Sequence, residues 1–330
     1  MNMISKDRLD SILKSARGRH VAVIGDFMLD RHLSGTVRRI SPEAPVPVVE
    51  IESETSGLGG AGNVISNLAG LGVKPIAFGV VGNDRAGELL REHISNEGGD
   101  GAGLVVSRDR KTSEKIRIIA DDQHVVRADR ETLHAITLHE ENLLLEAVKN
   151  SLNSIEAVIL QDYNKGVLTA RLITEMIALL NKSGISVSVD PKFDNFLEYK
   201  KVHLFKPNVK EVERAMGVRA ETDEQISEVG QRLCDYLTPD LLMITRGEKG
   251  IALFAKGEPM HTLPTRARQV HDVSGAGDTV ISTFAVADMG GATPLEAAAI
   301  ANLAGGIVCG HVGVVSISIS ELQEAVSFFR

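Results

Sequence analysis

The residue pattern with the most chemical meaning is a loop rich in glycine and aspartate, DVSGAGDT at residues 272–279. Gly275 and Gly277 permit a sharp turn and a close approach between backbone and ligand. The apolar residues 280–289 that follow predict a helix, whose first N–H groups and dipole favour a bound anion. Asp278, in the first turn, would face that anion and could accept a proton from a hydroxyl that attacks a phosphoryl group. The alternative is a glycine turn in which Asp278 only complements the dipole.

A second glycine-rich stretch, GLGGAGNVISNLAGLG, occupies residues 57–72. Its start matches the GxGxxG pattern of dinucleotide-binding folds, with Asp84 about twenty residues further on. We reject that interpretation because the polar residues 53–56 (SETS) separate the preceding apolar residues from the first glycine. It would also leave the aspartate loop without a role. The stretch therefore predicts a helix start at which bare backbone and Asn63 approach a polyhydroxylated substrate, or a helix packed closely through Gly and Ala.

Two carboxylates follow the first predicted strand, Asp26 directly and Asp30 shortly after it. Ligands of open α/β sheets bind beyond the carboxyl ends of the strands. A carboxylate at that place can accept hydrogen bonds from two sugar hydroxyls. The alternative is an N-cap or loop acid without a ligand.

The segment PNVKE at residues 207–211 also follows a predicted strand. Asn208 is a good N-cap and Glu211 its partner in a capping box, which is the structural interpretation. The functional interpretation places Glu211 near a hydrated Mg²⁺, an ion that keeps several waters and uses few protein ligands.

The segment TRGEKG at residues 245–250 follows a further strand. Gly247 and Gly250 would let a loop wrap around nucleotide phosphates, and Thr245 offers a hydroxyl. The alternative is a simple connection between two strands. The P-loop pattern GxxxxGK[ST] is absent from the sequence.

Composition and charge exclude several classes of protein. A net charge of −8 and a pI near 5.7 argue against nucleic acid or an anionic membrane as the main partner. The ten histidines are scattered without HExxH spacing, and no GxSxG nucleophile motif is present. Cys234 and Cys309 are predicted to be buried, reduced thiols. The N-terminal residues lack the apolar core of a signal peptide, and no apolar run reaches the length of a membrane span, so we expect a cytoplasmic protein.

The elements that must position these side chains alternate along the chain, with 330 residues sufficient for one large α/β domain and no linker to divide it. Short apolar runs predict buried strands at 21–25, 76–81, 157–160, 187–190, 202–205 and 241–245. Helical spacing predicts helices at 62–71, 85–96, 138–152, 170–181, 224–237, 280–289 and 294–309. This alternation predicts an α/β fold with a mostly parallel sheet covered on both faces.

Two stretches break the alternation. Residues 45–51 and 114–128 read as pieces of an antiparallel sheet, with a turn at Asp121, Asp122 and Gln123 in the second. A small sheet inserted into an α/β domain suits a lid or a dimer surface.

Taken in order, these segments resemble the ribokinase-like (PfkB) carbohydrate kinase family over nearly the whole chain. GGAGN at 59–63 resembles the first signature of the family, DVSGAGDT the second, and 208–211 its NxxE motif. A closer resemblance is to D-glycero-β-D-manno-heptose 7-phosphate kinases. It rests on residues 28–51, 161–168, 190–192 and 206–211, and on Val273, where many members of the family carry Thr.

The resemblance implies a three-layer sandwich with a lid from about residues 33–56 and 112–130, all within a single domain of residues 1–330. It implies transfer of the γ-phosphate of ATP to the anomeric hydroxyl of heptose 7-phosphate, giving the 1,7-bisphosphate for the lipopolysaccharide inner core. No HxGH motif of a fused nucleotidyltransferase is present, so a stand-alone kinase is expected. The alternatives are a kinase for ribose, fructose or a fructose phosphate, and a sugar- or nucleotide-binding regulator without catalysis.

The resemblance also implies roles for individual residues. Asp278 would be the base, and the amides of Gly275, Ala276 and Gly277 would bind the transferring group. Sugar hydroxyls would be held by Asp30, Gly59, Gly60, Asn63 and Asp162, and the 7-phosphate by Lys165, Lys192, Arg117 and Arg38. ATP would contact Asn208, Glu211, Thr245, Gly247, Gly250, Gly275, Gly277 and Asn302, with Mg²⁺ held through water by Asn208 and Glu211. A monovalent cation near the aspartate loop and a homodimer formed through the lid strands complete the expectation.

Overall fold

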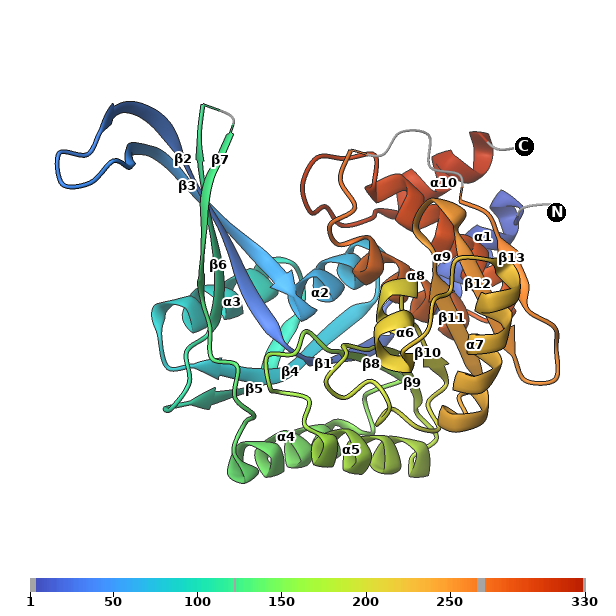
Figure 1. Cartoon of the computed structure of the whole chain (residues 1–330). Coiled ribbons are helices and arrows are strands. Elements are labelled where there is room, and N and C mark those ends of the chain that lie inside the picture. The colour runs from blue at the N-terminus through green and yellow to red at the C-terminus, as the bar shows by residue number, and fades with distance from the viewer. Residues whose placement is uncertain (1–3, 122, 266–270, 329–330) are drawn as a thin grey trace.

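A large sheet forms the centre of the molecule (Figure 1). The computed structural model describes residues 4–121, 123–265 and 271–328. The strands of this sheet are β1 (His20–Gly25), β4 (Lys74–Gly82), β5 (Asp100–Ser107), β8 (Ala157–Gln161), β9 (Ser186–Asp190), β10 (Leu204–Phe205), β11 (Leu241–Thr245), β12 (Ile251–Ala255) and β13 (His261–Leu263). Their order is β13-β12-β11-β10-β9-β8-β1-β4-β5, parallel except that β12 is antiparallel to both neighbours. The predicted, mostly parallel sheet is confirmed.

Helices cover both faces of this sheet. Successive strand residues point to opposite faces, and apolar residues on both faces need a covering layer. Val21 and Val23 of β1 pack into one apolar cluster, and Ala22 and Ile24 into the other. The first cluster receives α1 (Lys6–Ala16), α2 (Ala61–Gly70), α3 (Arg85–Asn96), α8 (Ala276–Met289), α9 (Pro294–Val308) and α10 (Ile319–Phe328). The second receives α4 (Leu138–Ser151), α5 (Ala170–Lys182), α6 (Val209–Met216) and α7 (Asp223–Leu237). The fold is the three-layer α/β sandwich that the sequence predicts.

A second, four-stranded sheet projects from one end of the first beside α3 (Figure 1). Its strands are β2 (Phe27–Ile40), β3 (Pro47–Gly60), β6 (Ser113–Ala120) and β7 (Gln123–Arg130), in the order β3-β2-β6-β7. The predicted antiparallel segments lie in it, but β2 pairs with β6 in parallel, so the sheet is mixed. Asp122 of the predicted turn lies outside the described residues. The function of this sheet as a lid stays a prediction.

One argument from the sequence was wrong. Residues 53–56 do not separate a strand from the glycines, because β3 runs through them and ends at Gly60. The dinucleotide-binding interpretation fails for a different reason. β3 belongs to the small sheet and pairs with β2 in antiparallel fashion, so the glycines do not stand inside a βαβ unit.

Two further findings concern the whole described chain. Cys234 and Cys309 are free thiols, as predicted, but both are half-buried instead of buried. Within the described ranges, no helix combines the length and apolar character that crossing a bilayer requires.

Candidate active site

Asp278 lies at the start of α8, opposite the carboxyl end of β8. Gly275 caps the helix with a φ of 76°, a left-handed conformation that favours glycine. Asp278 is buried, with 2% of its surface exposed, and the side chains of three other residues donate hydrogen bonds to it. Gln161 Nε2 (3.1 Å) and the Tyr163 hydroxyl (2.7 Å) donate to Oδ1, and Asn63 Nδ2 (3.1 Å) donates to Oδ2. The structure thus joins two segments that the sequence singled out, the aspartate loop and the first turn of α2.

The electrostatic surroundings of Asp278 suit proton transfer near neutral pH. Burial, and secondly the nearby Asp190 carboxylate, raise the pKa of Asp278 to about 6, although its hydrogen bonds and Lys206 oppose this. Asp190 itself is held by Lys206 Nζ at 2.9 Å and by Gln161 Nε2 at 3.2 Å. A carboxylate with such a pKa is ionised at physiological pH and still basic enough to accept a proton.

Sequence reasoning gave no role to Gln161, Tyr163, Asp190 and Lys206. A signal was present, because Gln161 and Asp190 are the last residues of the neighbouring parallel strands β8 and β9 and pair with each other. The rule that ligands bind beyond the carboxyl ends of strands applies to both as well as to Asp30. Side-chain direction in the segments after the strands was not predictable in the same way.

The loop between β8 and α5 is fastened at its start by Asp26. The buried carboxylate accepts hydrogen bonds from three backbone N–H groups of the loop, those of Tyr163 (2.8 Å), Lys165 (3.0 Å) and Val167 (3.1 Å). Asp26 is therefore the loop acid of the alternative interpretation. By fixing the loop backbone it holds the Tyr163 hydroxyl against Asp278.

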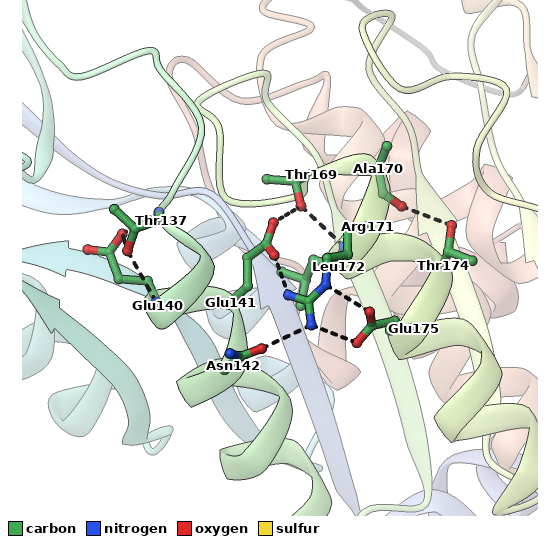
Figure 2. A network of polar contacts seen from close by, with 10 residues as sticks. All are labelled: Thr137, Glu140, Glu141, Asn142, Thr169, Ala170, Arg171, Leu172, Thr174 and Glu175. Atoms are coloured by element: carbon green, nitrogen blue, oxygen red, sulfur yellow. Dashed lines mark hydrogen bonds and ion pairs between the residues drawn. The ribbon is translucent and has the colours of Figure 1, made fainter.

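The other end of the same loop is fastened by a polar network between α4 and α5 (Figure 2). Glu141, at the start of α4, accepts hydrogen bonds from the Thr169 hydroxyl and from the Arg171 guanidinium. Arg171 also pairs with Glu175 at 2.8 Å and donates to Asn142 at 3.0 Å. Thr169 is the N-cap of α5, so the network fixes where the loop ends and the helix begins.

Asp162 does not face the site. Its Oδ2 accepts a hydrogen bond from the buried Tyr199 hydroxyl at 2.7 Å, and its Oδ1 accepts one from the Asn164 N–H at 2.8 Å. Burial, followed by the charge of Asp26, raises the pKa of Asp162 to about 6. Its predicted contact with sugar hydroxyls is not supported, because the side chain turns into the core.

The remaining sugar-binding candidates gather where the small sheet meets α2. A side chain at Gly59 would clash with Asp30, since an added Cβ would lie 2.8 Å from Asp30 Oδ2. Gly60 adopts a φ of 57° and precedes α2, whose first turn carries Asn63. Asp30 also pairs with Arg117 Nη1 of β6 at 3.0 Å.

The other predicted phosphate-binding cations are dispersed. Lys165 pairs with Glu131 at 2.7 Å. Lys192 pairs with Glu211 in the first turn of α6. Arg38 is 70% exposed and lies eight residues beyond Asp30 in β2, about 26 Å along the strand. Among the four candidates, only Arg117 contacts one of the sugar-binding candidates, Asp30.

The segments predicted to bind the nucleotide have clear structural roles. Asn208 and Glu211 form a complete capping box at the start of α6, with both hydrogen bonds at 2.9 Å. Thr245, at the end of β11, forms a parallel bridge with Asn208. Within the described ranges, no cluster of three or more His, Cys, Asp or Glu side chains is arranged to hold a metal ion.

Gly250 and Asn302 both contact the end of β13. A Cβ added to Gly250, which has a φ of +83°, would lie 2.0 Å from the Leu263 carbonyl oxygen. Asn302 of α9 donates to the Pro264 carbonyl at 2.9 Å. Gly247 also has a positive φ but faces open space. A surface hollow lies beside this loop and is lined by Glu221, Thr222, Asp223, Arg246, Lys249 and Thr262. Roles of these residues in nucleotide binding stay predictions.

Known proteins resemble this chain along most of its length. Among curated relatives, the bifunctional protein HldE of Syntrophotalea carbinolica is 40% identical over 325 residues, 98% of this chain and 66% of that protein. HldE of Caulobacter vibrioides is 43% identical over 323 residues, 97% of this chain and 66% of that protein. The chain therefore spans slightly less than two thirds of the length of these relatives.

Solved structures share the fold at low sequence identity. Arabidopsis thaliana ribokinase complexed with ribose and ATP superposes with a TM-score of 0.72 at 19% identity, covering 94% of this chain and 99% of that one. Escherichia coli phosphofructokinase-2 in complex with potassium gives a TM-score of 0.77 at 17% identity, with coverages of 94% and 99%.

The sequence model of the family described as "pfkB family carbohydrate kinase" matches residues 19–321 of this chain. This range contains both glycine-rich segments and the buried Asp278 that they surround. We conclude that the chain belongs to the pfkB family of carbohydrate kinases and is an ATP-dependent sugar kinase.

Proposed function

We propose that this kinase phosphorylates the anomeric hydroxyl of D-glycero-β-D-manno-heptose 7-phosphate, giving the 1,7-bisphosphate and ADP for lipopolysaccharide inner-core synthesis. The observation that carries the chemistry is Asp278, buried at the start of a helix with three donors and a pKa near 6. The choice of sugar rests on the resemblance of residues 28–51 to heptose 7-phosphate kinases and on identities of 40–43% to HldE proteins. Activities of the remaining third of HldE are outside this proposal.

The chemical step uses residues whose positions are known. Asp278 accepts the proton of the anomeric hydroxyl. The oxygen of this hydroxyl forms a bond to the γ-phosphorus while the bond between that phosphorus and the bridging oxygen of ADP breaks. Asn63, bonded to Asp278 Oδ2, orients the carboxylate. The first-turn amides of α8 have no acceptor within the helix and can stabilise the charge of the transferring group, each by roughly 3–4 kcal/mol. Ala276 N–H already donates to Val273 at 3.3 Å, so Gly277 is the better candidate.

The residues near Glu211 suit a hydrated Mg²⁺ and not a fully ligated one. Oxygen donors are the ligands that Mg²⁺ prefers, but Glu211 Oε2 accepts the Asn208 N–H and Oε1 pairs with Lys192. Asn208 and Glu211 would therefore hold the ion through water. When bound, Mg²⁺ would supply positive charge that offsets the charge of the nucleotide phosphates.

Arg117 is our choice for the 7-phosphate. It pairs with Asp30, whose carboxylate would instead accept sugar hydroxyls when substrate binds. The guanidinium, released from this pair, presents the planar set of donors that phosphate recognition favours.

The wider proposal retains a homodimer formed through the small sheet, a cytoplasmic location and a monovalent cation near residues 272–278. Exposed apolar side chains on the small sheet, among them Ile40, Ile51 and Val126, support a partner surface there. Analytical ultracentrifugation of the wild type and of an Ile40→Glu variant tests the dimer, and the proposal requires a lower mass for the variant.

The test of function is ADP release with Mg-ATP across a panel of sugars. The panel contains D-glycero-β-D-manno-heptose 7-phosphate, the unphosphorylated heptose, ribose, fructose and fructose 6-phosphate, with Asp278→Asn as control. We expect turnover with the heptose phosphate only, abolished in the variant. Turnover of another sugar would retain the kinase and refute the substrate. No turnover across the panel would favour a sugar- or nucleotide-binding regulator.

A further inference from the structure

Lys192 occupies a different part of the site from the other predicted phosphate-binding residues. It lies two residues after β9, and its Nζ forms an ion pair with Glu211 of the capping box. The same Nζ lies 5.5 Å from the ring centroid of Tyr163, whose hydroxyl donates to Asp278. The ammonium group therefore lies between the Glu211 segment, which we assign to the nucleotide, and the acceptor hydroxyl at Asp278.

The small sheet is on another side of the site. β9 is separated from β1 by β8, so Lys192 starts about 10 Å from the strand that leads into Asp30. No described contact joins Lys192 to Arg117 or to Asp30. This placement does not suit the 7-phosphate of the sugar.

Lys192 faces carboxylate and aromatic neighbours at the site. Its Nζ pairs with Glu211 and lies 5.5 Å from the ring centroid of Tyr163. Lys206 is also at the site, but it is 3% exposed and locked to Asp190 at 2.9 Å. Lys192 is 34% exposed, so it is the lysine of this pair that an incoming phosphate can reach.

We propose that Lys192 is a catalytic residue that binds the phosphoryl group during its transfer from the nucleotide to the hydroxyl at Asp278. The inference rests on the proposed kinase reaction. The oxygen–phosphorus bond to the sugar forms, the bond to the ADP oxygen breaks, and the sugar proton passes to Asp278. Lys192 stays protonated and balances the charge on the moving group.

The ion pair with Glu211 then has a function before transfer. It holds the ammonium in place while the phosphates are absent and occupies Glu211 Oε1. If Lys192 exchanged this carboxylate for a phosphate oxygen, Glu211 Oε1 would be free to hold Mg²⁺ through water. Binding of the γ-phosphate would then favour binding of the metal.

The experiment compares Lys192→Met and Lys192→Arg with a matched control, Lys200→Met. Lys200 is exposed and its Nζ lies 4.5 Å from the ring centroid of Tyr236, so it has the same kind of lysine–tyrosine contact away from the site. Three quantities are measured: kcat and KM with the best sugar of the panel, the ratio of ATP to ADP affinity by calorimetry, and the thermal midpoint.

We expect Lys192→Met to lower kcat about 100-fold, the scale of one charge-stabilising donor, with KM for the sugar phosphate little changed. The preference for ATP over ADP should also fall, because the lost contact is to the γ-phosphate. Lys192→Arg should recover part of kcat by keeping the charge. Lys200→Met should behave like the wild type.

A rise in KM for the sugar phosphate at unchanged kcat would overturn the inference and return Lys192 to the 7-phosphate. Unchanged kinetics and an unchanged ATP to ADP ratio would also overturn it. If no sugar of the panel is phosphorylated, the proposed function fails, but the affinity ratio still tests Lys192, because it needs no turnover.

Discussion

Replacing Asp278 with Asn should abolish activity and at the same time make the protein more stable at alkaline pH. The reason is the burial of the carboxylate, which raises its pKa from 3.8 to about 6. The native state therefore holds this proton more tightly than the unfolded state. As pH rises from about 4 to above 6, the native state must give the proton up, and the free energy of unfolding of the wild type decreases.

The magnitude follows from the shift. About two pKa units correspond to about 3 kcal/mol of lost stability at pH 8, at 1.36 kcal/mol per unit. The Asn side chain removes this cost but presents an amide donor to the donors of Gln161, Tyr163 and Asn63, at a cost of about 1–3 kcal/mol. We expect a net stabilisation of about 1 kcal/mol at pH 8. Below pH 4 the side chain at position 278 is uncharged in the native state of both the wild type and the variant. Asp278→Asn should then be no more stable than the wild type.

The assay is urea unfolding followed by far-ultraviolet circular dichroism at pH 4.5, 6 and 8, because the chain has no tryptophan. Asp162, whose pKa is also raised to about 6, titrates in both proteins and cancels in the difference. A stability difference independent of pH, or one that turns against the variant as pH rises, would refute the burial argument. Kinase activity measured on the same samples reports the loss of the base.

Three further predictions follow from single side chains. The carboxylate of Asp288 near the end of α8, 3.2 Å from His203 Nε2, raises the pKa of His203 to about 8. The stabilisation from this ion pair is complete below pH 6.5 and is lost as pH rises through 8. His203→Gln should cost about 2 kcal/mol at pH 6 and little at pH 9 in the same unfolding assay, and a constant cost would contradict this. Gly250→Ala should destabilise by about 2–4 kcal/mol, because its Cβ would meet the Leu263 carbonyl at 2.0 Å, whereas Gly247→Ala, strained but facing open space, should cost about 1 kcal/mol. Equal thermal shifts for the two glycine variants would disprove the clash. Arg117→Met should raise KM for heptose 7-phosphate about 10-fold or more and leave the affinity for the unphosphorylated heptose, measured by calorimetry, unchanged, and equal effects on both sugars would exclude a phosphate contact.

Much of the fold could be predicted because its signals are local. β11 (Leu241–Thr245) and α3 (Arg85–Asn96) have the predicted bounds, since an apolar run or a helical period identifies an element wherever it packs. The residue pattern did not mark β2 (Phe27–Ile40), because most of its residues are half-exposed and apolar and polar residues do not alternate there; only the family resemblance implied strands from about residue 33. Its parallel pairing with β6 joins segments about 80 residues apart and leaves no local signal.

The sequence by itself determined the position of the proposed base and its helix. The glycines permit the turn that begins the helix, and the apolar residues that follow form the helix itself. Both signals come from neighbouring residues, and Asp278 lies in the first turn as predicted. The Asn208–Glu211 cap was equally predictable, since a capping box is closed within one turn.

Only the tertiary structure decided which side chains face Asp278. Asp162 and Tyr163 are adjacent in sequence, yet Asp162 turns inward to Tyr199 and Tyr163 turns to Asp278, because Asp26 holds the backbone of their loop. Lys192 likewise pairs with Glu211, whereas the sequence suggested it for the sugar phosphate. Sequence order records which residues are neighbours along the chain. The direction of a loop side chain depends on buried polar groups contributed by distant strands, whose hydrogen bonds form only when the sheet is assembled.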